Sequence, residues 1–87
     1  MSAIEEAKAG LEAAKEHAET AWQEASQAKE TAAETIDMIL NVTGPDLPEL
    51  ASIPFNMIQE AQNQIEQAQA LLSSAQEALE EYSNSLG

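Results

Sequence analysis

The chain has 87 residues, with three basic against sixteen acidic side chains and a formal net charge of −13. It contains no cysteine and one histidine, which excludes a disulfide framework, a cysteine-based zinc site and a thiol nucleophile. A negative field of this size repels phosphate backbones and anionic lipid surfaces, so we expect neither a nucleic acid nor a membrane as partner.

The N-terminal half of the chain predicts one long helix over about 3–40. Ser2 and Glu5 form a Ser-x-x-Glu capping box at its start, which satisfies free main-chain N–H groups of the first turn. No proline interrupts the segment before Gly44-Pro45, a pair that stops a helix.

A connecting corner is expected over 41–53, followed by a second helix over about 54–82 and a frayed tail over 83–87. Ser52 is the expected cap of the second helix, and Pro54 is tolerated in a first turn. Neither half alternates with a period of two, so strands are not expected. The predicted fold class is all-α, with residues 1–87 forming one antiparallel two-helix hairpin.

Both predicted helices carry an apolar repeat with alternating spacings of three and four residues, the pattern of a coiled coil. Alanine dominates this repeat, which lets the helix axes approach closely. Large residues facing small ones fill the space between the helices. The predicted seam consists of Ala18, Ala21, Ala25, Ala28, Ala32, Ile58, Ala61, Ile65, Ala68, Leu72, Ala75 and Leu79.

A second set of residues is expected beside this seam. Lys8, Lys15, Trp22, Lys29 and Ile36 recur every seven residues, and so do Gln62, Gln69 and Gln76. We expect these two lines to lie near each other with no carboxylate facing the lysines, either as a groove for another helix or as surface residues paired within their own helix. The candidate partner-interface residues are Trp22, Ile36, Leu40, Phe55, Met57 and Leu71. Trp22 alternatively folds over its own hairpin.

A single alanine-rich hairpin has little apolar surface to bury. Pairing of two hairpins into a four-helix bundle is the ordinary solution. The expected partner is a protein, either a second copy of the chain or another helical protein. A homodimer doubles the negative charge, which favours a less acidic partner.

Catalysis is not expected, because the carboxylates fall mostly on outward positions and no nucleophile–base set accompanies them. The neighbours of His17 one turn away are Ala13, Ala14, Thr20 and Ala21, none of which is a metal ligand. We therefore expect no enzyme, no cofactor and no metal site.

The short, acidic, cysteine-free helical hairpin resembles the small helical-hairpin proteins of type VII secretion systems, the WxG-like group. Tyr82-Ser83-Asn84-Ser85 approaches that group's C-terminal Tyr-x-x-x-Asp/Glu signal but is followed by Leu86, and Trp22 falls within the first helix rather than in the turn. The resemblance implies an accessory partner that binds the helical region of a type VII-exported protein.

Two other function classes fit the same sequence. One is a homodimeric structural or scaffold bundle, and the other is an acidic antitoxin or inhibitor of a basic partner. The chain has no apolar run of membrane-spanning length and no recognisable leader. The expected location is therefore the cytoplasm, or outside the cell by export without a cleavable signal peptide.

Overall fold

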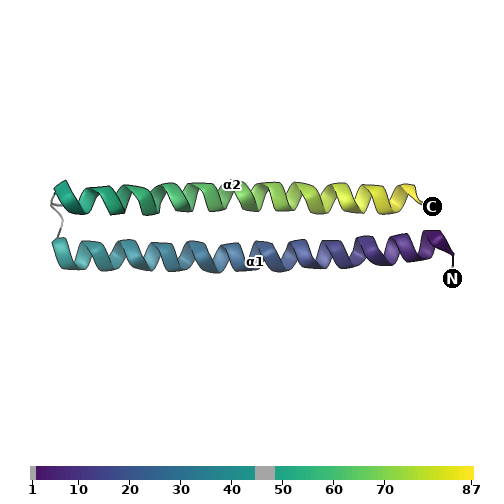
Figure 1. Ribbon diagram of the computed structural model, residues 1–87, viewed down its shortest axis with the longest axis horizontal. Coiled ribbons are helices and arrows are strands. Elements are labelled where there is room, and N and C mark those ends of the chain that lie inside the picture. The colour runs from purple at the N-terminus through teal and green to yellow at the C-terminus, as the bar shows by residue number, and fades with distance from the viewer. Residues whose placement is uncertain (1, 45–48) are drawn as a thin grey trace.

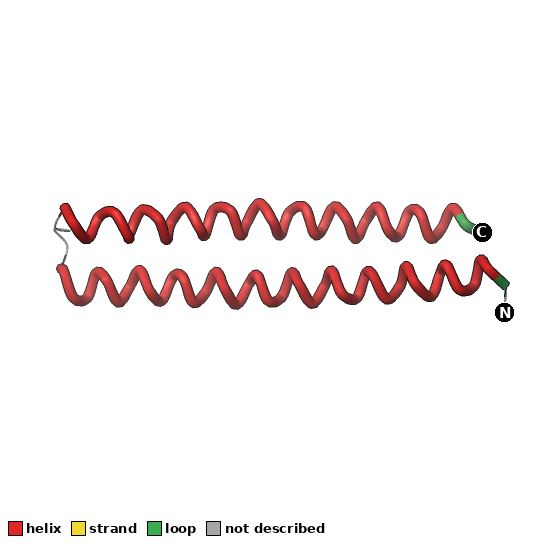
Figure 2. The backbone as a smooth tube through the Cα atoms, viewed as in Figure 1, coloured by secondary structure: helices red, strands yellow, loops and turns green. Residues whose placement is uncertain are grey.

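In a computed structural model of the chain, residues 2–44 and 49–87 are described and form two long antiparallel helices (Figure 1). Helix α1 spans Ala3–Thr43 and helix α2 spans Glu49–Ser85. The two helices lie side by side, and both chain termini lie at the same end (Figure 2). The predicted all-α hairpin is therefore confirmed.

The first helix begins and ends where local chemistry requires it. The main-chain N–H of Glu5 donates to the Ser2 hydroxyl oxygen at 3.1 Å, which is one half of the predicted capping box. Gly44 has a φ of +76°, a conformation that favours glycine after a helix. Its N–H donates to the Leu40 carbonyl oxygen at 2.8 Å. The helix thus ends directly before Gly44, one of the two residues predicted to stop it, but three residues beyond the predicted end near residue 40. Pro45, the other stop residue, lies outside the described residues.

Both helices are longer than the sequence pattern indicated. Helix α1 continues to Thr43, and α2 begins at Glu49 instead of near residue 54. Ser52, the expected cap, lies inside α2, where its hydroxyl donates to the Glu49 carbonyl oxygen at 2.7 Å. Pro54 is the sixth residue of α2 rather than part of its first turn, so its missing N–H lies beyond the four that a helix start leaves free and removes one main-chain hydrogen bond. The expected corner therefore overestimated the length of the connection.

The C-terminal end of α2 is also more ordered than expected. The predicted frayed tail is helical through Ser85, and the Ser85 hydroxyl donates to the Tyr82 carbonyl oxygen at 2.7 Å. This bond supplies a partner for one of the carbonyl groups that a helix end leaves free.

The seam between the helices is formed by residues that alternate at spacings of three and four. Each of these residues is at least partly shielded from solvent. On α1 they are Lys8, Leu11, Lys15, Ala18, Trp22, Ala25, Lys29, Ala32, Ile36, Ile39 and Thr43. On α2 they are Phe55, Ile58, Gln62, Ile65, Gln69, Leu72, Gln76, Leu79 and Ser83, and Leu86 continues the spacing directly after the end of the helix.

The observed seam differs from the predicted one by one residue at alternate positions. Ala18, Ala25, Ala32, Ile58, Ile65, Leu72 and Leu79 lie on it as predicted. Ala61, Ala68 and Ala75 are exposed, and the residues that directly follow them, Gln62, Gln69 and Gln76, occupy the seam instead. On α1, Ala28 is exposed and Ala21 is only half-buried at the seam's edge, next to Lys29 and Trp22.

The physical reason for this difference is side-chain length. An alanine methyl is too short to fill the space between two helices, whereas the stems of glutamine, lysine and tryptophan reach across it. Long polar side chains can bury their stems while their polar ends find partners at the edge. Ranking residues by hydrophobicity selected the alanines and therefore placed the seam one position too early.

Candidate interaction surface

Three glutamines of α2 bind the main chain of α1 at intervals of seven residues. The side-chain amides of Gln62, Gln69 and Gln76 donate to the carbonyl oxygens of Lys29, Trp22 and Lys15, at 3.5, 3.2 and 3.4 Å respectively. Gln69 is 6% exposed and is the one buried residue in the described part of the chain. The predicted proximity of the glutamine and lysine lines is thus observed, but inside the seam rather than beside it.

Alanines of α1 provide the space that these glutamines occupy. The alternating spacing of an antiparallel seam puts Ala18, Ala25 and Ala32 at the levels of Gln76, Gln69 and Gln62. A small residue opposite a long one fills the layer without a void. The alanine-rich middle of α1 is therefore matched to long polar side chains on α2, and not to alanines as expected for these three positions.

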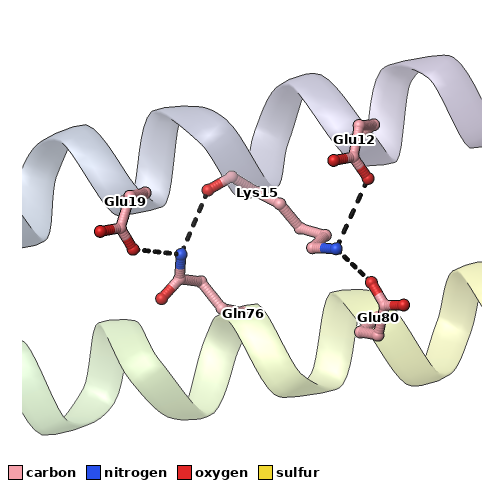
Figure 3. Close-up of polar contacts among 5 residues, drawn as sticks. All are labelled: Glu12, Lys15, Glu19, Gln76 and Glu80. Carbon is pink, nitrogen blue, oxygen red and sulfur yellow. Dashed lines mark hydrogen bonds and ion pairs between the residues drawn. The ribbon is translucent and has the colours of Figure 1, made fainter.

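Two lysines of the seam reach carboxylates on the other helix, contrary to the expectation that none would face them. The Lys15 ammonium contacts Glu80 on α2 and Glu12 on α1, the latter at 3.5 Å (Figure 3). Lys29 lies 3.8 Å from Glu66. A sequence-only register could not show these pairs because it placed both lysines outside the seam.

The ion pair with Glu80 also affects the titration of Lys15. The hydrogen bond that Lys15 donates to Glu80 is the main reason that its pKa lies above the ordinary value of 10.5, and the charges of Glu12 and Glu80 act in the same direction. Partial removal of water from the ammonium opposes this increase. The protonated form of Lys15 is therefore the form that the closed hairpin favours.

These contacts define one side of the hairpin, which we call the carboxylate flank. Its residues recur every seven positions along each helix, and those from Glu12 onward each directly follow a seam residue. On α1 they are Glu5, Glu12, Glu19, Ser26, Ala33 and Leu40, and on α2 they are Gln59, Glu66, Ser73 and Glu80. Both helices contribute carboxylates here. Figure 3 shows Gln76 donating to Glu19, at 3.1 Å, beside the Lys15–Glu80 pair.

The opposite side of the hairpin has a different composition, and we call it the alanine flank. Its residues also recur every seven positions, and each directly precedes a seam residue. On α1 they are Ala7, Ala14, Ala21, Ala28, Thr35 and Val42, and on α2 they are Pro54, Ala61, Ala68, Ala75 and Tyr82. None of these described residues is charged, and all except Ala21 and Thr35 are classed as exposed. The hairpin is therefore amphipathic from side to side.

Large apolar side chains are exposed on and around the alanine flank. Met38, Val42, Met57, Leu71 and Tyr82 have exposed fractions between 57% and 86%. Val42 and Tyr82 belong to the flank, and the other three lie one helical turn before a flank residue, along its border. At the loop end, Met38, Ile39, Val42 and Pro54 line a shallow apolar groove together with Thr35, Thr43 and Ala51.

The predicted partner-interface residues fall into two groups. Trp22, Ile36 and Phe55 are half-buried in the seam of their own hairpin, and Leu40 is half-buried on the carboxylate flank. Met57 and Leu71 are 67% and 72% exposed at the border of the alanine flank. Sequence reasoning missed Met38, Val42 and Tyr82 as surface residues. The available signal was their spacing relative to the exposed alanines.

The described residues include no cluster of three or more metal-ligating side chains, and no described helix is both long and apolar enough to cross a membrane. No protein-family model, curated protein or solved structure matches this chain.

Proposed function

We propose that this chain is a non-enzymatic helical protein–protein interaction module that buries its alanine flank against other helices. The observation that carries the proposal is the absence of any buried hydrophobic residue among the residues that the structure describes. Apolar burial is the dominant favourable contribution to folding. A hairpin that lacks a buried core gains most when its exposed apolar side is covered.

The distribution of charge supports the alanine flank as the surface that is covered. Removing a carboxylate from water is costly unless it is paired. The carboxylate flank therefore resists burial, whereas the alanine flank carries no charge to desolvate. Large apolar patches on a soluble protein commonly mark interaction sites, and Met38, Val42 and Tyr82 extend this flank with bulky side chains.

A four-helix bundle is the arrangement that this surface suits. Small residues allow helices to pack closely, and two hairpins packed face to face share one core. One proposed binding partner of the alanine flank, based on the resemblance to type VII helical-hairpin proteins, is the helical region of an exported protein. The alternative occupant is a second copy of the chain.

Hydroxyl-radical footprinting tests the proposed function without a known partner. Met38, Met57 and Tyr82 are reactive side chains that are exposed in the isolated hairpin. We expect each to be protected in an extract of the source cells, relative to the purified chain at high dilution. Glu-rich outward positions such as Glu34 and Glu60 serve as controls that stay equally accessible. Full reactivity of the alanine flank in both samples would contradict the proposal.

A further inference from the structure

We infer that the alanine flank binds a second copy of this chain, with the loop end of each hairpin lying over the free end of the other. The inference rests on the proposed function, because it names the occupant of the same surface. Three features carry it: the area of the flank, the position of the charges, and the distribution of large and small side chains along the hairpin.

The area of the flank is sufficient for a stable dimer. The Cα extents of the hairpin are 63 × 15 × 14 Å. A face of 63 Å by 15 Å covers about 900 Å², close to the ~800 Å² per partner that stable interfaces bury. A second hairpin of the same length and width covers this face completely.

The charges are placed so that two copies can meet without direct repulsion. The three carboxylates that pair with seam lysines, Glu12, Glu66 and Glu80, are on the flank that would face away from the partner. Charges separated by more than about 10 Å are largely screened at ordinary salt. The residues one helical turn before the flank positions form the border of the alanine flank. Among those that the structure describes, Glu24 is the one acidic residue. The overall charge of −13 is thus a weak argument against self-association.

The same distribution argues against a strongly basic partner on this face. Recognition of basic side chains requires carboxylates at or around the contact surface. The alanine flank offers uncharged residues only. A surface of this composition is complementary to another uncharged, alanine-rich surface, and a second copy supplies one.

Side-chain size determines the orientation. Exposed bulky residues gather at the loop end, where Met38 and Val42 line the apolar groove and Ile53 and Met57 are exposed near the start of α2. Apart from Tyr82, the free end offers small residues: Ala7, Gly10, Ala14, Ala75 and Ala78. Packing is best where large residues face small ones. A two-fold axis at the middle of the flank places the loop end of each copy over the free end of the other, so that large residues face small ones at both ends of the dimer.

One aromatic side chain fits this orientation in particular. Tyr82 lies within one turn of the end of α2 and is 57% exposed. The groove formed by Met38, Ile39 and Val42 lies within two turns of the end of α1. With loop end over free end, Tyr82 of each copy comes to the region of the other copy's groove, where its ring can pack on apolar atoms.

Sedimentation equilibrium of the purified chain tests the inference with a matched pair of variants. Ala68 and Ala70 are both exposed alanines of α2, but only Ala68 belongs to the alanine flank. We expect the wild type to dimerise and Ala68→Glu to raise the dimer dissociation constant at least about 100-fold, because it buries a carboxylate. Ala70→Glu should change it less than about threefold, as an exposed surface substitution. Circular dichroism of both variants at equal concentration checks that each is helical.

Cross-linking tests the orientation in the intact hairpin. The chain has no cysteine, so Ala7→Cys and Val42→Cys introduce unique thiols at opposite ends of the flank. When the two variants are mixed, a short bismaleimide should link residue 7 of one chain to residue 42 of another. These links should far outnumber links between two copies of residue 7 or between two copies of residue 42. Like-with-like links would overturn the antiparallel orientation.

The outcomes separate this inference from the proposed function. A chain that stays monomeric at every concentration, or a dimer that Ala68→Glu leaves intact, overturns the second-copy inference. If the alanine flank is then still protected in the cell extract, the proposed function stands with a different helical partner. If the flank is unprotected as well, both fail.

Discussion

The Gln69 side-chain amide donates to the main-chain carbonyl oxygen of Trp22 at 3.2 Å, which joins the middle of α2 to the middle of α1. Gln69 is also the residue that the hairpin shields most from solvent. A polar residue at this depth would be costly without a partner. With its partner it fixes the helices relative to each other, because a shift along the axis breaks the bond.

We therefore expect Gln69→Ala to lower the free energy of unfolding by about 1 kcal/mol, the usual contribution of an intramolecular hydrogen bond. Gln67→Ala is the matched control, since Gln67 is exposed on the same helix. It should change stability by less than about 0.5 kcal/mol. Urea titration followed by circular dichroism measures both. Equal effects of the two substitutions would show that the glutamines of the seam have no special role.

A second prediction concerns the alanines opposite these glutamines. Ala25 is half-buried in the seam at the level of Gln69, so Ala25→Leu overfills that layer. We expect a destabilisation of about 1–3 kcal/mol, as for other overpacked interiors. Ala13→Leu adds the same side chain at an exposed position of α1 and should be close to neutral. An unchanged thermal midpoint for Ala25→Leu would contradict the close packing of the two helices.

These layers show why the sequence predicted the fold better than the surface. Helix starts and stops depend on local chemistry, so Ser2 and Gly44 were identified correctly. The face that each helix turns inward depends on both helices together. A hydrophobicity ranking prefers Ala68 to Gln69, but the other helix offers a carbonyl oxygen to Gln69, whereas Ala68 is exposed.

The same one-residue difference explains the mixed result for the interface candidates. Trp22 and Ile36 were placed beside the seam because the predicted repeat ran through the residues directly before them, Ala21 and Thr35. With the seam corrected, both residues are partly shielded by their own hairpin, and the exposed alanines form the alanine flank. Leu71 was predicted at an interface independently of this choice, and it is exposed beside the alanine flank.

A third prediction follows from the raised pKa of Lys15, which comes chiefly from its hydrogen bond to Glu80. A lysine whose pKa is higher in the folded state stabilises that state fully below its ordinary pKa of 10.5. The stabilisation disappears as the pH rises through the folded-state pKa. We expect the wild type to lose stability for this reason as the pH rises above 10.5.

Lys15→Gln should remove part of that pH-dependent loss of stability, because the glutamine side chain has no proton to release. Lys8→Gln is the control, since Lys8 is a seam lysine of the same helix for which the structure shows no ion pair in the described residues. Thermal melts at several pH values give the comparison. A loss of the same size in Lys15→Gln and Lys8→Gln would mean that the Lys15–Glu80 pair contributes nothing measurable, as is common for exposed pairs.

The last prediction uses one substitution at two glycines with opposite expected effects. Gly10 lies inside α1, and a Cβ added there meets no atom within 4 Å. Alanine restricts the unfolded chain and favours the helix, so Gly10→Ala should stabilise the hairpin by about 0.5–1 kcal/mol. Gly44 has a φ of +76°, which an alanine adopts only with strain, so Gly44→Ala should destabilise by about 1–2 kcal/mol. Urea titration of both variants against the wild type measures the two effects. If Gly44→Ala were neutral, the positive φ of Gly44 would not be what ends the first helix.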